Sequence, residues 1–174
     1  LSGIICVLLV LFILLEVTKN RAIAVLGAVA TLTSPALFEA ARQVRLDVPV
    51  TAFVLLALYA FIRGRENPLW YLLVGVAVAL AVMTKSVIGL FAGPILLIWA
   101  VTHNDYRWLK EWYFWAGALL GLAIVAPWHW YEHLHFGARF WQEYLGTHVV
   151  DRFAKNILGT QVAESNVLYF KHLL

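Results

Sequence analysis

Long apolar runs alternate with short polar connections along this chain. Six runs stand out, at residues 4–15, 22–38, 48–62, 69–83, 87–101 and 112–131. They are rich in Leu, Ala and Val without a regular polar–apolar alternation, which predicts helices. Inside a bilayer a helix also satisfies its backbone hydrogen bonds within one segment. The pattern therefore predicts an all-α fold class, a polytopic membrane helical bundle of about six spans.

The composition supports a membrane location. Of the 174 residues 63% are hydrophobic and 13% are charged, and the mean hydropathy is +0.80. A soluble domain of this size cannot bury so much apolar surface, whereas a bilayer can cover it. The net charge of +3 is spread between the runs, which argues against a nucleic-acid partner. A single cysteine, Cys6, excludes an internal disulfide and a cysteine-based metal site.

The connections predict the sidedness of the bundle. Those at 16–21, 63–68 and 103–110 fall on one side and carry six basic residues: Lys19, Arg21, Arg63, Arg65, Arg107 and Lys110. The positive-inside rule makes that side cytoplasmic. Basic residues also occur on the opposite side, so their total number does not decide the orientation. Bases that stand outside against the rule are candidates for function.

The character of the chain changes after Tyr131. Aromatic and apolar residues recur there at helical spacing, while charged residues lie largely off that stripe. The stripe comprises Phe140, Trp141, Tyr144, Leu145, His148, Val149 and Phe153. We expect an amphipathic helix on the outer membrane surface. The predicted division is a transmembrane bundle at 1–131 and an extracytoplasmic loop at 132–174, which carries this juxtamembrane helix and leads toward a further span.

Two arginines and a carboxylate lie between the second and third runs. Arg42 and Arg45 are three residues apart, so on a helix they share a face and could bind a phosphate with two guanidinium groups. Asp47 precedes Val48 and Pro49 at the start of an apolar run. In a plainer interpretation Asp47 is a helix N-cap and both arginines reach toward lipid headgroups. The two interpretations are compatible, because a capping carboxylate has a second oxygen.

Lys85 follows the end of the fourth run, on the same predicted outer side. Its ammonium could bind a lipid phosphate, pair with Asp47 across the bundle, or simply lie at the interface. The sidedness was derived without these residues, yet it brings Arg42, Arg45, Asp47 and Lys85 to one membrane face.

Histidines give a weaker signal. His129 and His133 are four residues apart and could share a helix face, which permits a pair of metal ligands but is also common for solvated interfacial histidines. We assign no residue to a metal. His148 and Arg152 have the same spacing on the predicted amphipathic helix and could contact a phosphate or a carboxylate.

Several short motifs carry a family likeness. They are the Arg-x-x-Arg-Leu-Asp run from Arg42 to Asp47, the Met-Thr-Lys run that ends at Lys85, Pro127-Trp128 at the end of a later span, and the aromatic outer segment that ends in Asp151-Arg152-Phe153. With these motifs the chain resembles the multi-spanning glycosyltransferases of the GT-C type. It looks most like the bacterial branch related to protein O-mannosyltransferases and to the lipid A aminoarabinose transferase.

The resemblance implies a sugar transferred from a polyprenyl-phosphate donor to a lipid, glycan or protein acceptor, on the non-cytoplasmic face of a bacterial inner membrane. Anionic lipid phosphate leaves in such a reaction, so Arg42, Arg45, Lys85, His148 and Arg152 are expected to bind substrate. Asp47 matches a position that organises the site. The sequence leaves open whether a divalent metal serves as a cofactor.

One family feature has no counterpart here. Such enzymes carry an acidic residue, assigned as catalytic base, in a first outer loop, and no such loop precedes residue 4. We therefore assign no base and expect an internal segment that is inactive alone. Two alternatives stay open: a transporter or flippase for a lipid-linked or anionic substrate, and a non-catalytic membrane subunit.

Overall fold

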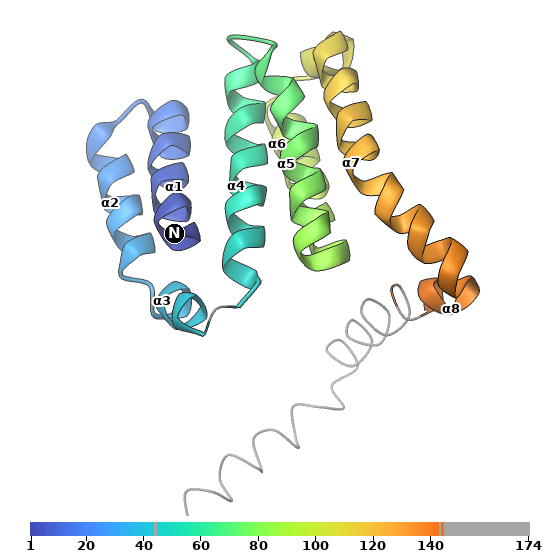
Figure 1. Ribbon diagram of the computed structural model, residues 1–174. Helices are drawn as coiled ribbons and strands as arrows, with labels where there is room; N and C mark the ends of the chain where they lie inside the picture. The colour runs from blue at the N-terminus through green and yellow to red at the C-terminus, as the bar shows by residue number, and fades with distance from the viewer. Residues whose placement is uncertain (44, 143, 145–174) are drawn as a thin grey trace, which may run out of the picture. The chain divides into compact units, whose positions relative to one another are not determined.

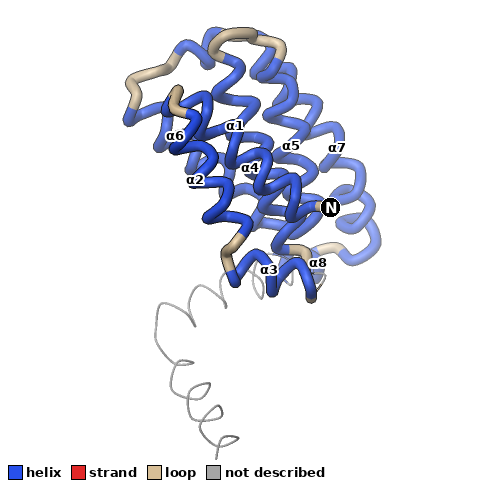
Figure 2. Tube along the Cα trace, turned by 90° about the vertical axis from the view of Figure 1, so that its left-hand side faces the viewer, coloured by secondary structure: helices blue, strands red, loops and turns tan. Residues whose placement is uncertain are grey.

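The described part of the chain is helical. The computed structural model describes residues 1–43, 45–142 and 144, and no strand occurs among them (Figures 1 and 2). The α-helices are α1 (Ser2–Thr18), α2 (Arg21–Leu32), α3 (Pro35–Arg42), α4 (Asp47–Gly64), α5 (Trp70–Lys85), α6 (Ala92–Thr102), α7 (Trp112–Phe136) and α8 (Ala138–Trp141). Two 3₁₀ helices, η1 (Ser86–Phe91) and η2 (Arg107–Lys110), flank α6. The all-α prediction is confirmed.

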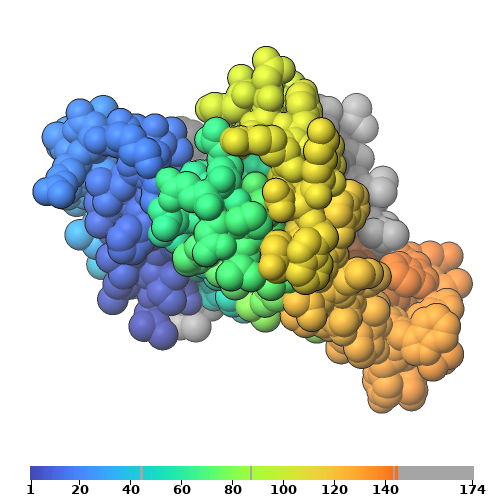
Figure 3. Space-filling model, turned by 90° about the horizontal axis from the view of Figure 1, so that it is seen from above, coloured from blue at the N-terminus to red at the C-terminus, as the bar shows by residue number. Residues whose placement is uncertain are grey.

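The chain divides into two units, residues 1–128 and residues 129–174. In the first unit α1 packs against α2 and α4, and α4 packs against α5. The connections α1–α2, α4–α5 and α6–α7 lie at the same end of this unit, drawn uppermost in Figure 1. Figure 3 looks down on that end, with residues of α1 and α2 in blue, of α4 and α5 in green and of the segment before α7 in yellow. We call it the loop end.

The expected second helix at 22–38 is broken. α2 stops at Leu32 and α3 starts at Pro35, with a bend of 48° between them. Proline has no N–H to continue the backbone ladder, but it fits the first turn of a new helix. The prediction of one uninterrupted helix over this run was therefore wrong, and the break places Thr33 and Ser34 between two helices.

Two later runs also differ from expectation. The run at 87–101 divides into η1 and α6 instead of one helix. α7 continues through Pro127 to Phe136, so Pro127-Trp128 lies inside a helix, and the end of a span at this point stays a prediction. A proline inside a helix removes one backbone hydrogen bond, which a 25-residue helix can tolerate.

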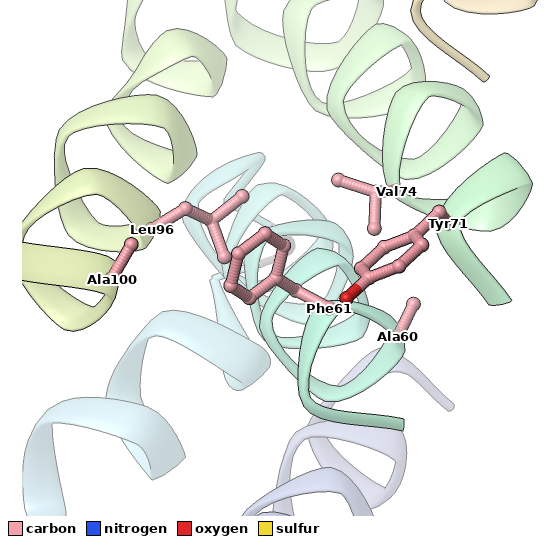
Figure 4. Close-up of a cluster of buried hydrophobic side chains, with 6 residues drawn as sticks. All are labelled: Ala60, Phe61, Tyr71, Val74, Leu96 and Ala100. Atoms are coloured by element: carbon pink, nitrogen blue, oxygen red, sulfur yellow. The ribbon is translucent and has the colours of Figure 1, made fainter. Parts of the chain in front are cut away.

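Aromatic rings fill the core near the loop end. Phe61 is 2% exposed and Tyr71 is 3% exposed, and their ring centroids are 5.8 Å apart (Figure 4). Phe61 also meets Trp99 and Trp108 at centroid distances of 5.7 and 5.8 Å in edge-to-face geometry. Such contacts stabilise beyond the burial of area. They tie α4, α5, α6 and the η2 segment together.

Small residues allow α5 and α7 to approach closely. A Cβ on Gly117 would lie 2.5 Å from the Tyr71 carbonyl oxygen and 2.9 Å from the Leu72 Cα. Gly121, one turn further along α7, is equally close to the backbone of Gly75. This is the small-xxx-small spacing that lets helix backbones touch in membranes.

By length and composition, one described helix could cross a membrane: α4, with its 18 residues. The bent pair α2 and α3 would count as a second if it forms one span. The six-span topology therefore stays a prediction. Many large apolar side chains of the first unit are exposed, among them Leu26, Ile98 and Leu119 at 68%, 64% and 67%.

Candidate functional site

Asp47 is the first residue of α4, and its carboxylate joins two cations. Its Oδ2 lies 3.0 Å from Nε of Arg45, and its Oδ1 accepts a hydrogen bond from Nζ of Lys85. The expected N-cap role is wrong, because the cap position is Leu46 and no side chain caps this helix start. The carboxylate instead links the loop before α4 to the end of α5.

Lys85 reaches Asp47 from a sharp turn. It is the last residue of α5, and Ser86 follows with φ 51° and ψ −133°, a conformation that L-residues rarely adopt. The turn folds η1 back onto α5, where a Cβ on Gly89 would collide with the backbone at Ala81 and Val82. A tight reversal, held by close packing, thus presents the ammonium. Of the roles considered for Lys85, the pairing with Asp47 is the one found in this structure.

The two arginines do not share a helix face. Arg42 is the final residue of α3, whereas Arg45 lies beyond the helix in the turn before α4. The Arg42 guanidinium lies over the Phe38 ring at 5.8 Å and forms no ion pair within the described residues. The prediction of two guanidinium groups on one helix face was wrong, because α3 stops before Arg45.

The cluster is accessible and carries an excess positive charge. The side chains of Arg45, Asp47 and Lys85 are 57%, 35% and 27% exposed. One carboxylate between two cations leaves a local charge of +1, and the N–H groups not used by Asp47 can donate to an incoming anion. We name Arg45, Asp47 and Lys85 the Asp47 triad. Chemically it can hold a phosphate and neutralise charge that develops on it.

A cavity adjoins the triad on the side of α2 and α3. Its volume is about 540 Å³, and it is broadly open to its surroundings. Five of its lining residues are apolar, and the polar ones are Thr31, Ser34, Asp47 and Thr51. Sequence reasoning missed this cavity. Thr31 and Ser34 are polar residues in an otherwise apolar run next to a proline, and that was the available signal.

The loop end holds a different set of ion pairs. Asp105, 7% exposed, lies 2.8 Å from Nε of Arg65 and 3.0 Å from Nε of Arg107. Hydrogen bonds from Arg107, opposed by burial and helped by the charge of Arg65, hold the pKa of the Asp105 carboxyl at about 2. The Arg65 guanidinium also lies over the Trp99 ring at 5.0 Å.

A second network at the loop end joins α1 to α4. Nη1 of Arg63 is 2.7 Å from a carboxylate oxygen of Glu16 and 2.7 Å from one of Glu66. Glu16 also pairs with Lys19 at 2.7 Å. These groups bind one another across the connections, so their charges are largely used within the fold.

The second unit is described only through residue 142 and at 144. There Nε2 of His129 lies 2.9 Å from the Tyr144 hydroxyl, and Nδ1 of His133 accepts from the Trp141 indole at 3.0 Å. The described residues contain no group of three or more His, Cys, Asp and Glu side chains that could hold a metal. The proposed substrate residues His148 and Arg152, and most of the predicted amphipathic helix, lie outside the described residues.

A comparison with protein families identifies the chain's relatives. Residues 1–131 match the family model described as dolichyl-phosphate-mannose-protein mannosyltransferase. The chain belongs to this family, whose members are membrane glycosyltransferases of the GT-C type. No curated protein and no solved structure matches the chain. The resemblance drawn from the short motifs is thus confirmed over three quarters of the sequence.

Proposed function

We propose that this member of the mannosyltransferase family transfers a sugar from a polyprenyl-phosphate donor to a lipid, glycan or protein acceptor. The observation that carries the proposal is the Asp47 triad. A carboxylate held between an arginine and a lysine leaves N–H groups of both cations available to a lipid phosphate, while it remains ionised itself.

The chemistry assigns separate roles to the triad. When an acceptor oxygen attacks the anomeric carbon, the bond from that carbon to the phosphate oxygen breaks, the polyprenyl phosphate leaves with the bonding electrons, and the proton of an attacking hydroxyl is released to water. Lys85 and Arg45 stabilise the negative charge that develops on this leaving group. Asp47 holds both cations in place and is a positioning residue. Arg42, His148 and Arg152 are further substrate-binding candidates.

The proposed setting is a multi-pass protein of a bacterial inner membrane. Residues 1–131 form the transmembrane bundle, in about six spans, and 132–174 the extracytoplasmic part. The loop end carries the short basic connections and faces the cytoplasm, which places the Asp47 triad at the non-cytoplasmic face. The exposed apolar side chains of the first unit then face lipid.

Radiolabelled sugar transfer tests this function. The full-length protein in liposomes is supplied with a panel of polyprenyl-phosphate sugars, with wild type beside Asp47→Asn. We expect transfer by the wild type and a loss of at least about tenfold in a folded Asp47→Asn protein. Transfer that does not depend on Asp47 would contradict the role of the triad, and no transfer from any donor would contradict the function.

A transporter or flippase is the second candidate. The 48° break between α2 and α3 favours it, because discontinuous helices are frequent at transport sites. Movement of a fluorescent polyprenyl phosphate between the leaflets of the same liposomes separates the two functions. Translocation without sugar transfer would favour the transporter.

A further inference from the structure

The cavity beside Asp47 has a chemistry of its own, distinct from that of the cations. Its apolar part comes from small or branched side chains: Ala30, Ala36, Leu37, Ala40 and Val48. Its polar part contains three hydroxyls and a carboxylate, and neither Arg45 nor Lys85 lines it. A phosphate would find no cation in this cavity, so it fits an uncharged group better.

The hydrogen-bonding groups of the cavity lining limit the kinds of molecule that can bind there. The hydroxyl of Thr31 donates to the Gly27 carbonyl at 2.8 Å, and that of Thr51 donates to the Asp47 carbonyl at 2.7 Å. Their protons are committed, so toward the cavity both oxygens act as acceptors. The Asp47 carboxylate, with its cations on Oδ1 and Oδ2, has lone pairs left and accepts as well.

Ser34 supplies the donor. It stands at the N-cap of α3, where a serine commonly caps the helix, yet its side chain makes no capping hydrogen bond. No hydrogen bond of its hydroxyl occurs with any residue in the described part of the chain. The break between α2 and α3 thus places a free hydroxyl on the cavity wall. An occupant that donates several hydrogen bonds and accepts one would satisfy this lining.

We propose that the cavity binds the sugar ring of the donor and that Ser34 is a specificity-determining residue. The inference rests on the proposed function. A sugar ring offers hydroxyls that both donate and accept, together with C–H faces that suit the alanine wall. An isoprenoid chain in the same space would offer no partner to the Ser34 hydroxyl and no donor to the remaining lone pairs of Asp47, Thr31 and Thr51.

The position of Asp47 supports the donor sugar rather than an acceptor glycan. Asp47 belongs to the cavity lining and also holds the two cations assigned to the donor phosphate. In a polyprenyl-phosphate sugar the phosphate is bonded directly to the anomeric carbon. A phosphate at Lys85 and Arg45 therefore carries its sugar ring to the neighbourhood of Asp47, where the cavity lies.

Binding measurements on paired lipids test this inference. The full-length protein in nanodiscs is titrated with short-chain mannosyl, glucosyl and arabinosyl polyprenyl phosphates and with the same polyprenyl phosphate without sugar. The quantity of interest is the ratio of the affinity for the tightest sugar-bearing lipid to that for the sugar-free lipid. We expect Ser34→Ala to lower this ratio by about three- to tenfold, the cost of one neutral hydrogen bond.

A neighbouring threonine provides the matched control. Thr33 is exposed, its hydroxyl donates to the Val29 carbonyl at 2.9 Å, and it does not line the cavity. Thr33→Ala should leave the ratio unchanged, whereas Ala36→Leu, which fills the cavity, should lower it without weakening the sugar-free lipid.

Two results would overturn the inference. One is a ratio that Ser34→Ala leaves at the wild-type value. The other is an Ala36→Leu protein that loses affinity for the sugar-free lipid equally, because the cavity would then hold the lipid chain. Sugar transfer by the wild-type preparation is measured alongside, so that an error about the cavity is distinguished from an error about the proposed function.

Discussion

The two ends of the first unit use the same side-chain types for different purposes. At the loop end Asp105, Glu16 and Glu66 are matched with arginines across the connections, and Asp105 is 7% exposed. At the other end Asp47 joins two cations while remaining 35% exposed, beside a cavity of about 540 Å³. An ion pair whose groups are satisfied within the protein stabilises the fold, whereas an ion pair with accessible groups beside a cavity can bind a ligand.

The position of each end in the fold explains this difference. The loop end is enclosed by an aromatic core, where Phe61 meets Trp99 and Trp108, so buried charge there must find partners inside the protein. The Asp47 triad stands where α3, α4 and α5 end or begin, and a helix break at Ser34 opens space beside it. Stability should therefore respond to changes at the loop end, and substrate binding to changes at the triad.

A substitution at the α5–α7 contact, between the two ends, should reduce both stability and sugar transfer. Gly117→Ala places a Cβ 2.9 Å from the Leu72 Cα, so the α5 and α7 backbones must separate. We expect a loss of about 1–3 kcal/mol in the free energy of unfolding and reduced transfer together, because overpacking shifts backbones. Thermal unfolding followed by tryptophan fluorescence in detergent measures the loss.

Gly3→Ala in α1 is the control for that substitution. The new Cβ would meet only the Ala41 Cβ at 3.9 Å, an ordinary contact. Alanine is favoured over glycine in a helix by up to about 1 kcal/mol, so this variant should be neutral or more stable. Equal losses in both variants would contradict the close packing of α5 on α7.

At the triad, removal of a cation should affect binding more than folding. Lys85→Ala should weaken binding of polyprenyl-phosphate donor by roughly tenfold, the low end expected for a charge-assisted hydrogen bond at a partly exposed site. The unfolding temperature should change little, because exposed ion pairs contribute at most about 1 kcal/mol.

Lys85→Arg is the informative companion, since it keeps the charge but changes the geometry. Partial recovery of donor affinity in Lys85→Arg is the expected result. Donor affinity equal to the wild type in Lys85→Ala would remove the phosphate role from this residue.

At the loop end, the pH dependence of stability should report Asp105. Its pKa in the folded protein is about 2, below the ordinary aspartate value of 3.8, because hydrogen bonds from Arg107 favour the ionised form. A lowered folded-state pKa gives stability that is present above the unfolded pKa and is lost as the pH falls through the folded one. A pKa shift of about two units corresponds to a contribution on the order of 2 kcal/mol to the free energy of unfolding for this buried group.

Unfolding free energies of wild type and Asp105→Asn between about pH 5 and pH 2 check this expectation. The wild type should lose stability over that range, and the variant should follow a flatter course. Parallel pH profiles would show that the Asp105 ion pairs contribute nothing measurable.

The smallest effect is expected at the rim of the loop end. Glu66 pairs with Arg63 at 2.7 Å, but its side chain is 57% exposed. Glu66→Gln should cost less than about 0.5 kcal/mol, because solvent screens such a pair and Arg63 keeps Glu16. A double-mutant cycle with Arg63→Met measures the coupling, and a coupling above about 1 kcal/mol would assign this pair a structural role like that of Asp105.

The sequence predicted the chemistry of the triad better than its geometry. Charged residues are rare at the ends of apolar runs because they are costly to place in a membrane, so Asp47 and Lys85 could be identified as candidates. The predicted topology placed both at the same membrane face. The break at Ser34 and the end of α3 at Arg42 depend on packing between helices, which a hydropathy pattern does not contain. The expected arginine pair on one helix face failed for that reason.

The fold shows the same division. The helical class follows from apolar runs without alternation, and the break in the second run could have been inferred from Pro35 after Ser34. The continuation of α7 through Pro127 could not have been inferred from the sequence. A helix tolerates an internal proline only where its surroundings compensate for the lost hydrogen bond. The close contact of Gly75 with Gly117 pairs positions 42 residues apart, and no local pattern links them.

The most direct test compares Asp47→Asn with Asp105→Asn in one experiment. For each variant, sugar transfer per folded molecule in liposomes is measured beside the unfolding temperature in detergent. We expect that Asp47→Asn loses transfer and unfolds near the wild-type temperature, while Asp105→Asn unfolds at a lower temperature and keeps its transfer per folded molecule. The reverse pattern, or transfer lost equally in both, would contradict the separation of a ligand-binding end from a structural one.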